Sequence, residues 1–398
     1  MTEPLDVLNL ADGVRLEVVA RSDGLAAVPM VVDAGGWRRA AAGDGAAEAL
    51  LRMLTEGSAT IGRFTIRSWT IRAATGERSV GVDQTNESVI VGETAVVKWA
   101  THLQEGPHPA PRRIAVLREK GFHGIPVPWG LITWEPPDGA ETLVVSVDEY
   151  LPGAVDGWTW AVDLATGAAL TGRHDDLISA TRQVGELVAD MHAALASTSG
   201  VPTADDVARW HRDALATLDT VCELDGSASV RLARERRTDI AAELDGLAEV
   251  GRTPVIAGHG DLHVGQILLA GGRFVVTDFD GNPVLPAEQR ALRIPPMLDV
   301  AGMTQSLAHV AVVARRYTEL DPQESARADA SGRRSFLTAY RAQLRARGVE
   351  PFYVHALLRP FRIQQVLREI VYATRHLPRW MYVPDAALPA LLDDGITS

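Results

Sequence analysis

The sequence contains a single cysteine, Cys222, among 398 residues. One thiol can form neither an internal disulfide nor a cysteine-rich zinc site, which fits a protein of a reducing compartment. The N-terminus, from Met1 to Asp6, also lacks the basic region and apolar stretch of a targeting signal. We therefore expect a cytoplasmic protein that is held together by its hydrophobic core.

Positive charge is also scarce, since 39 Lys and Arg stand against 51 Asp and Glu, for a formal net charge of −12. Nucleic acids and anionic membranes bind cationic surfaces, so we expect neither of them as a partner. We also expect no segment of membrane-spanning length. Any phosphate-binding site must then be a local exception to the charge of the chain.

The sequence does contain enough apolar material for a full-size core. Hydrophobic residues make up 46% of the chain and charged residues 23%, which is typical of a globular protein of two or three domains. The sequence leaves the oligomeric state open, and we favour a monomer.

The most informative stretch begins at His259 and continues to Asp278. Asp261 ends a short loop, Gln266 follows five positions later, and an apolar hairpin then leads to Asp278. In phosphotransferases such an Asp accepts the proton of the attacking hydroxyl, while an amide and a second Asp hold Mg²⁺. The spacing therefore predicts Asp261 as the catalytic base and Gln266 and Asp278 as magnesium ligands.

An ordinary β-hairpin with solvent-facing acidic residues is the alternative for this stretch. Both interpretations predict paired strands at 267–269 and 274–276, joined by a turn that contains two glycines. Only phosphotransfer requires carboxylates on both sides of the hairpin, so we prefer it.

A polar hairpin and a lysine-bearing strand come earlier in the chain. Residues 79–92 have the pattern of strand, polar turn and strand, and Lys98 stands in the apolar strand that follows. In kinases such a hairpin covers the nucleotide phosphates, and the next strand carries a Lys that reaches them. We expect Lys98, Thr85, Asn86 and Ser88 to bind ATP in this way. The alternative places Lys98 on the solvent face of an edge strand.

The helix expected at 110–119 departs from the kinase pattern. A kinase usually places here the Glu that pairs with the strand Lys. The early positions instead carry Arg112 and Arg113, and Glu119 is near the far end. Either Glu119 pairs with Lys98, another carboxylate does, or the nucleotide itself steers the lysine.

An apolar strand that ends in a short acidic linker separates this region from helical sequence. That pattern is typical of a hinge between two lobes, so we expect backbone groups of Asp148, Glu149 and Tyr150 to meet the adenine edge of ATP. The helical sequence beyond it contains His192, for which a structural role is more common than a catalytic one.

A helix predicted at 361–377 has an unusual polar face. Gln365, Glu369 and Tyr372 share that face at helical spacing, and Trp380 follows the end of the helix. These groups suit a sugar, because polar side chains bind hydroxyls, a ring stacks on the pyranose, and an acid attracts an amine. The alternative is an exposed helix face beside a surface tryptophan.

Several of these stretches resemble one family of proteins. The runs at 259–268, 278–283, 150–154 and 83–88 are similar to maltokinases, which are members of the aminoglycoside-phosphotransferase-like kinase superfamily. The resemblance implies an α+β, bilobal, eukaryotic-protein-kinase-like fold that uses ATP and Mg²⁺.

The resemblance also implies how the chain is divided. It places an N-terminal cap subdomain at 1–82 and a nucleotide-binding subdomain at 83–150, which together form a β-rich N-lobe, and a mainly helical C-lobe at 151–398. It implies Asp280 as a further metal ligand and puts Asp299 near the acceptor sugar. The alternative for Asp299, in the first turn of a helix predicted at 297–317, is a favourable interaction with the helix dipole.

The run from Gln365 to Trp380 is similar to the signature of the glucosamine kinases that branch from this group. This resemblance implies ATP-dependent phosphorylation of glucosamine to glucosamine 6-phosphate. The amino-sugar pocket would consist of Gln365, Glu369, Tyr372 and Trp380, with Asp299. Maltokinase or aminoglycoside phosphotransferase activity is the alternative within this chemistry, and a catalytically silent nucleotide- or sugar-binding regulator is the alternative from another class.

Overall fold

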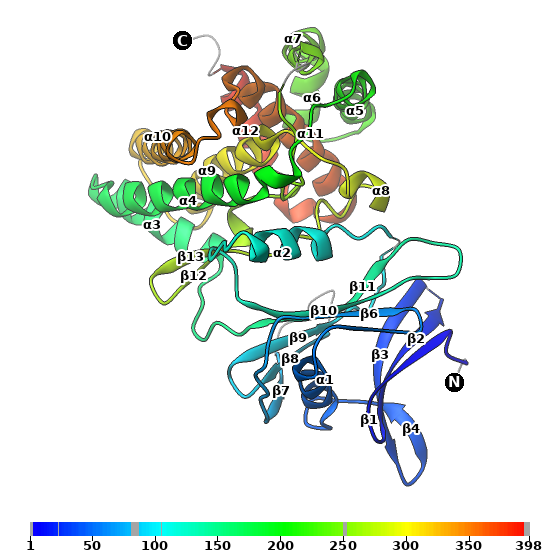
Figure 1. Cartoon of the computed structure of the whole chain (residues 1–398). Helices are drawn as coiled ribbons and strands as arrows, with labels where there is room; N and C mark the ends of the chain where they lie inside the picture. Colours follow the sequence, from blue (N-terminus) through cyan, green and yellow to red (C-terminus); the bar gives the residue numbers. More distant parts are fainter. Residues whose placement is uncertain (1–2, 23, 81–86, 105, 250–252, 394–398) are drawn as a thin grey trace. The chain divides into compact units, whose positions relative to one another are not determined.

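The computed structural model of the chain describes residues 3–22, 24–80, 87–104, 106–249 and 253–393. The chain forms two compact units (Figure 1), of which the first comprises Met1–Ala154 with Thr277–Leu292 and the second comprises Val155–Val276 with Arg293–Ser398. The first unit is rich in strands and the second is mainly helical. This content confirms the predicted α+β class.

The first unit begins with a four-stranded antiparallel sheet in the order β1-β2-β3-β4. Its strands are β1 (Asp6–Ala11), β2 (Val14–Arg21), β3 (Gly24–Asp33) and β4 (Gly36–Arg39), and helix α1 (Ala46–Thr55) follows them. Buried leucines of α1 share one hydrophobic core with this sheet and with the larger sheet that comes next.

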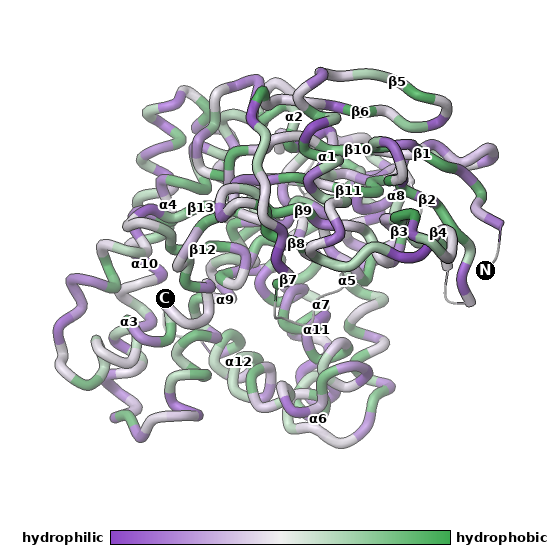
Figure 2. The backbone as a smooth tube through the Cα atoms, turned by 90° about the horizontal axis from the view of Figure 1, so that it is seen from below, coloured by the Kyte–Doolittle hydropathy of each residue, from purple (hydrophilic) through white to green (hydrophobic). Residues whose placement is uncertain are grey.

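The larger sheet has seven strands in the order β5-β6-β10-β11-β9-β8-β7. The strands are β5 (Ala59–Ile61), β6 (Phe64–Ser68), β7 (Glu77–Ser79), β8 (Glu87–Val91), β9 (Ala95–Trp99), β10 (Pro128–Trp134) and β11 (Thr142–Glu149). Figure 2 shows the apolar colour of β9 and β11 near the middle of this sheet. Strands from before and after residue 82 pair in it, and the subdomain border proposed there stays a prediction.

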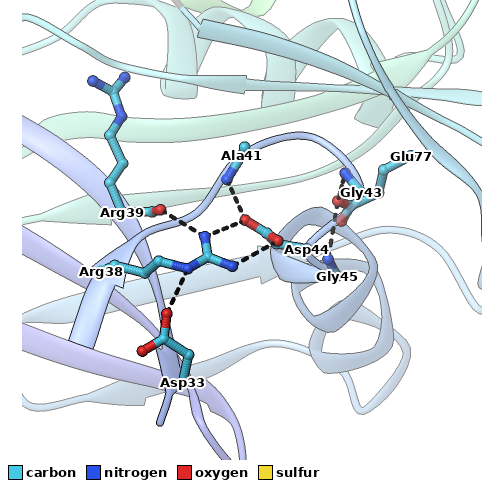
Figure 3. Close-up of polar contacts among 8 residues, drawn as sticks. All are labelled: Asp33, Arg38, Arg39, Ala41, Gly43, Asp44, Gly45 and Glu77. Atoms are coloured by element: carbon cyan, nitrogen blue, oxygen red, sulfur yellow. Dashed lines mark hydrogen bonds and ion pairs between the residues drawn. The ribbon is translucent and has the colours of Figure 1, made fainter. Parts of the chain in front are cut away.

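Polar side chains hold the loop that leads into α1 (Figure 3). The Asp44 carboxylate accepts hydrogen bonds from Arg38 Nη1 and Nη2 at 2.6 and 2.9 Å. Gly45, at the start of α1, has a φ of 87° and no side chain to cap the helix. Glu77 of β7 supplies the acceptor instead, with Oε2 3.0 Å from Gly45 N and Oε1 2.9 Å from Glu48 N. These bonds tie β7 to α1.

Two helices complete the first unit: α2 (Ala110–Glu119) and α8 (Ala287–Arg290). The predicted helix at 110–119 is thereby confirmed. The segment that contains α8 returns to the first unit after the chain has passed through the second.

The second unit is built from nine helices and one hairpin within its described residues. The helices are α3 (Gly157–Thr171), α4 (Asp175–Ala194), α5 (Ala204–Glu223), α6 (Ala228–Glu235), α7 (Arg237–Leu244), α9 (Pro296–Tyr317), α10 (Pro322–Ala346), α11 (Leu358–His376) and α12 (Tyr382–Asp393). Strands β12 (Ile267–Ala270) and β13 (Arg273–Val276) pair with Ile267 opposite Val276 and Leu269 opposite Phe274. The hairpin predicted from the sequence is confirmed.

Helix α9 is buried along most of its length, as expected for a helix at the centre of a helical unit. By length and composition its 22 residues could cross a membrane, so the expectation that no segment reaches such a length was wrong. Its most apolar part is 78% buried inside the structure. Unusually for a core helix, α9 also carries buried polar side chains, which are Asp299, Thr304, Gln305, Ser306 and His309.

Candidate active site

The loop that carries Asp261 is held by a buried carboxylate of α9. Asp299 is 1% exposed and accepts hydrogen bonds from the backbone N–H groups of His259 and Gly260, both at 2.8 Å. Burial alone raises the pKa of Asp299, but hydrogen bonds from His192 and from the Gly260 N–H hold it below its usual value. Asp299 is therefore an anion that fixes the backbone just before Asp261.

His192 is fully buried beside the same carboxylate. Its Nε2 lies 3.2 Å from Asp299 Oδ2, and its Nδ1 lies 2.8 Å from the Tyr340 hydroxyl. These contacts favour the structural role that the sequence indicated for His192. They also give Asp299 a positioning role, whereas its predicted place beside the acceptor sugar stays a prediction.

The same face of α9 approaches the loop at two further points. Ser306 Oγ accepts a hydrogen bond from Val264 N at 2.9 Å. Between Asp299 and Ser306 along α9, the backbone of Leu262 comes very close to the helix. A Cβ at Gly302 would lie 2.6 Å from the Leu262 carbonyl oxygen. Because Asp299, Gly302 and Ser306 recur at helical spacing, one stripe of α9 sets the path of the catalytic loop.

Asp261 is half-buried and follows Gly260, whose φ of 83° makes the turn into the loop. Its negative charge acts on two residues of α11. Burial lowers the pKa of Arg368 and the charge of Asp261 partly opposes this, whereas burial raises the pKa of Glu369 and the charge of Asp261 adds to the rise. The structure thus brings the predicted base and the predicted sugar-binding helix together, although they are far apart in the sequence.

Glu369 lies in a chain of polar groups that runs from α9 to α11. Arg362 Nε donates to Gln305 Oε1 at 3.0 Å, which leaves the Gln305 amide nitrogen as a donor toward His309 Nε2 at 3.0 Å. His309 Nε2 is then an acceptor, and His309 is neutral. Burial, with the charges of Arg362 and His263, lowers the pKa of His309 to about 3, in agreement with that assignment.

One oxygen of Glu369 has a donor and the other does not. Oε1 accepts from Gln365 Nε2 at 2.9 Å. Oε2 lies 3.3 Å from His309 Nε2, which already accepts from Gln305, and it is shielded from solvent with no hydrogen-bond partner among the described residues. Burial raises the pKa of Glu369 to about 8 despite the bond from Gln365, and the charge of Asp261 adds to the rise.

The aromatic residues predicted for the sugar pocket have different surroundings. Tyr372 is 44% exposed, and its ring lies 5.2 Å from that of His376. Trp380 packs edge-on against Trp158 of α3 at 5.4 Å. Trp158 in turn lies against the catalytic loop, since a Cβ at Gly265 would be 3.0 Å from its Nε1. Trp380 is therefore linked to the loop through Trp158.

Gln266, the predicted amide ligand, ends a short 3₁₀ turn that starts at Val264. Its Nε2 lies 3.3 Å from His263 Nε2, and its backbone N–H donates to the His263 carbonyl at 2.9 Å. The turn keeps Gln266 next to Asp261 in the same loop. Its role as a metal ligand stays a prediction.

The two predicted metal-binding aspartates belong to the first unit. Asp278 has a φ of 64°, a conformation that costs a non-glycine residue about 1–3 kcal/mol and is common at functional sites. Burial and the neighbouring charge of Asp278 raise the pKa of Asp280 to about 6, while Lys98, Arg113 and Arg290 oppose that rise. Two acidic side chains separated by one residue form a suitable place for a cation.

The donor set fits Mg²⁺ that is shared with a nucleotide better than a resident metal. Among the described residues, no three His, Cys, Asp or Glu side chains lie close enough to hold an ion by themselves. Mg²⁺ commonly uses one or two carboxylates and completes its shell with phosphate oxygens and water. Asp278 and Asp280 match that arrangement.

Lys98 lies in β9, which has β11 on one side and β8 on the other, so the edge-strand alternative is wrong. Burial raises the pKa of Asp148 and of Asp280, and the charge of Lys98 opposes both rises. Glu119 is exposed and pairs with Lys120 at 3.0 Å. Of the alternatives for the lysine, the structure therefore favours carboxylates other than Glu119.

The other predicted nucleotide contacts are only partly described. Thr85 and Asn86 lie outside the described residues, and Ser88 is buried opposite Lys98 in the β8–β9 pair. In the predicted hinge, the backbone N–H groups of Glu149 and Tyr150 already donate to carbonyl groups of the first unit, at 2.8 and 2.9 Å. Their role in ATP binding stays a prediction.

Sequence reasoning missed four residues that contact these groups. Gln305 and His309 looked like ordinary members of a helix, Trp158 stood outside any motif, and Arg113 was noted only as a departure from the kinase pattern. The signal that could have found the first two is a pair of polar residues at i and i+4 in an otherwise apolar helix.

Replacing Gly302 with alanine tests whether the α9 stripe sets the catalytic loop. The new methyl group would collide with the Leu262 carbonyl, 2.6 Å away, and displace the loop. We expect Gly302→Ala to lower kcat by about 10- to 100-fold, the cost of a small misplacement of a reacting group.

The matched control is Gly167→Ala in α3, where a Cβ would meet nothing within 4 Å. It should keep the wild-type kcat and gain up to about 1 kcal/mol of stability from its helix propensity. A wild-type kcat in Gly302→Ala would show that α9 does not position the loop.

Known proteins are similar to this chain over nearly its whole length. The chain is 58% identical over 398 residues to a glucosamine kinase of Mycolicibacterium smegmatis, and the match covers 99% of both proteins. A glucosamine kinase of Streptacidiphilus jiangxiensis is 48% identical, with 98% of this chain and 91% of that protein covered. Residues 145–323 match the phosphotransferase enzyme family.

Solved structures give the same result. A glucosamine kinase in complex with glucosamine, ADP and inorganic phosphate has a TM-score of 0.88 and 43% identity, with 98% of this chain and 93% of that chain covered. A separate crystal form of a glucosamine kinase has a TM-score of 0.89 and 42% identity, with 98% and 94% covered. The chain is therefore a kinase, and it belongs to the glucosamine kinase family of phosphotransferases.

Proposed function

We propose that this kinase transfers the γ-phosphate of ATP to the 6-hydroxyl of glucosamine. Two relatives that are 58% and 48% identical to nearly the whole chain are glucosamine kinases, and one related structure contains glucosamine with ADP. Within this chain, the observation that carries the proposal is the unpartnered Glu369 Oε2 on a helix beside Asp261.

The ammonium group of an amino sugar suits that oxygen. An ammonium group donates three hydrogen bonds and accepts none, so it complements a carboxylate oxygen that has no internal donor. His309 cannot compete for Oε2 because Gln305 keeps its facing nitrogen an acceptor. A bound ammonium would favour the charged form of Glu369 and lower its raised pKa. A sugar with a hydroxyl in place of the amine brings no positive charge, so it would not stabilise the buried carboxylate of Glu369 in its charged form.

The phosphoryl transfer needs one proton acceptor. Asp261 takes the proton of the sugar hydroxyl as its oxygen forms the new bond to the γ-phosphorus, and the bond to the ADP oxygen breaks. The backbone bonds to Asp299 hold the loop before Asp261 so that this carboxylate is positioned when the sugar binds. Gln365 and the rings of Tyr372 and Trp380 are proposed to contact the sugar itself.

Charge near the phosphates is supplied by the first unit. Lys98, with Ser88 and the turn residues Thr85 and Asn86, is proposed to bind ATP. Asp278 and Asp280, and Gln266 from its spacing in the sequence, would hold Mg²⁺, which neutralises phosphate charge when it is bound.

Replacing the base should separate chemistry from binding. Asp261→Asn keeps the shape of the side chain but cannot accept the proton, so we expect kcat to fall by about 10²- to 10⁴-fold. The affinity for ADP, measured by calorimetry, should change little. Asp225→Asn, at a fully exposed position of the same unit, serves as the control and should match the wild type.

Wild-type rates in Asp261→Asn would refute the assignment of the base. Wild-type protein that binds ATP and glucosamine but forms no phosphosugar would instead support the silent-regulator alternative. Proton-coupled ³¹P NMR of the product identifies the phosphorylated hydroxyl, and a phosphate on any carbon other than C6 would contradict that part of the proposal.

Replacing Glu369 should change the choice of sugar. A hydrogen bond to a charged group is worth about 1.5–3 kcal/mol, so Glu369→Gln should lower kcat/KM for glucosamine by about 10- to 100-fold. The value for glucose should change far less, and the KM for ATP should stay near that of the wild type.

Glu186→Gln on α4 removes a carboxylate from the surface of the same unit and should leave the ratio of the two sugars unchanged. If Glu369→Gln kept the preference of the wild type for glucosamine over glucose, this helix would not recognise the amine.

A further inference from the structure

Arg113 occupies a position that the proposed reaction does not explain. It lies in the first turns of α2 and is 2% exposed, whereas the adjacent Arg112 is exposed. Its Nη1 donates to the Phe279 carbonyl at 2.7 Å, and its Nη2 donates to the Arg290 carbonyl at 2.9 Å. One buried guanidinium therefore joins α2 to both ends of the segment that returns to the first unit.

The first of these carbonyls lies in the backbone between the two predicted metal-binding carboxylates. Phe279 is the single residue between Asp278 and Asp280, so its carbonyl belongs to the peptide group that leads into Asp280. Asp278 has a left-handed backbone conformation, with φ of 64°, that needs support from its neighbours.

The loop is closed tightly around the guanidinium. Gly281, with φ of 74°, approaches it so closely that a Cβ there would lie 3.2 Å from Arg113 Nη1. The same Cβ would lie 3.4 Å from the Cβ of Arg290. A side chain at this position would push against the arginine that holds the loop, which explains why glycine suits it.

We propose that Arg113 is a positioning residue that orients Asp278 and Asp280 for the Mg²⁺–nucleotide complex. It does so through the backbone of Phe279 and not by touching the nucleotide. The inference rests on the proposed function in one respect, which is that these two aspartates hold the metal. Other kinases carry, on the corresponding helix, a glutamate that pairs with the strand lysine. In this kinase, Arg113 on that helix instead holds the loop that carries Asp278 and Asp280.

The test compares Mg²⁺-dependent and metal-free binding of ADP by calorimetry on the full chain. Arg113→Met removes both donors and keeps an unbranched apolar side chain. Residues that orient metal ligands typically change metal affinity by about 10- to 100-fold, so we expect Mg²⁺ to strengthen ADP binding at least about tenfold less than in the wild type. ADP affinity without metal should change less than about twofold, a split that a purely structural defect would not produce.

Three further variants make each outcome decisive. Arg112→Met, on the exposed neighbour, should behave as the wild type. Arg113→Lys keeps the charge and at least one donor, so it should recover part of the Mg²⁺ effect. If Arg113→Met does not fold, Arg113→Lys takes its place, and its Mg²⁺ effect should still be smaller than that of the wild type. Asp278→Asn should abolish the Mg²⁺ effect.

The results separate the inference from the proposed function. If Asp278→Asn kept the full Mg²⁺ effect, the proposed metal ligands would be wrong, whatever Arg113 does. If Asp278→Asn lost the effect while the folded Arg113 variant kept it, the positioning role of Arg113 would be overturned. Equal losses of ADP affinity with and without metal would also overturn it.

Discussion

The second unit depends on one buried carboxylate. Asp299 accepts two backbone hydrogen bonds from the loop that ends at Asp261 and a third contact from His192. Burying a charge destabilises the folded state unless hydrogen-bond donors or opposite charges surround it. Removing one of these partners therefore leaves a buried charge that no other contact stabilises. The arrangement therefore permits one path for the loop backbone, and the position of the catalytic base follows from it.

The helix that carries Asp299 also carries the groups that prepare the amine site. Along α9, one stripe of residues contacts the catalytic loop: Asp299, Gly302 and Ser306. Gln305 contacts Arg362 of α11, and His309 lies beside Glu369 of the same helix. The hydrogen bond from Gln305 makes His309 Nε2 an acceptor, and this leaves one oxygen of Glu369 without a donor. A single apolar helix with a few polar positions thus serves both the reaction and the choice of substrate. In the first unit, Arg113 has a comparable role for the loop of Asp278 and Asp280.

Much of this could be predicted from the sequence, for identifiable reasons. The spacing from Asp261 to Gln266, followed by a hairpin that ends at Asp278, predicted a phosphotransferase catalytic loop. An ordinary hairpin does not require carboxylates on both sides of it. The polar face of α11 stood out because Gln365, Glu369 and Tyr372 share the side opposite the apolar face of the helix. Membership of the glucosamine kinase family is confirmed by the comparisons.

The remaining features depend on contacts that periodicity does not encode. Helical spacing shows which residues share a face, but it does not show that Asp299 turns toward loop N–H groups or that Gln305 is oriented by Arg362. Arg113 appeared as a departure from a pattern, since its carbonyl partners lie far along the chain. Buried polar networks are set by partners from distant elements, and these are known only once the chain is folded.

The most direct measurement of the central claim is a crystal structure of this kinase with glucosamine and a non-hydrolysable ATP analogue. We predict that the sugar nitrogen lies about 2.7–2.9 Å from Glu369 Oε2, the distance of a charge-assisted hydrogen bond. We also expect the 6-hydroxyl to lie within hydrogen-bond reach of Asp261, at about 2.6–3.2 Å. A bound sugar whose amine faces another group, with Glu369 Oε2 still beside His309 alone, would contradict the account.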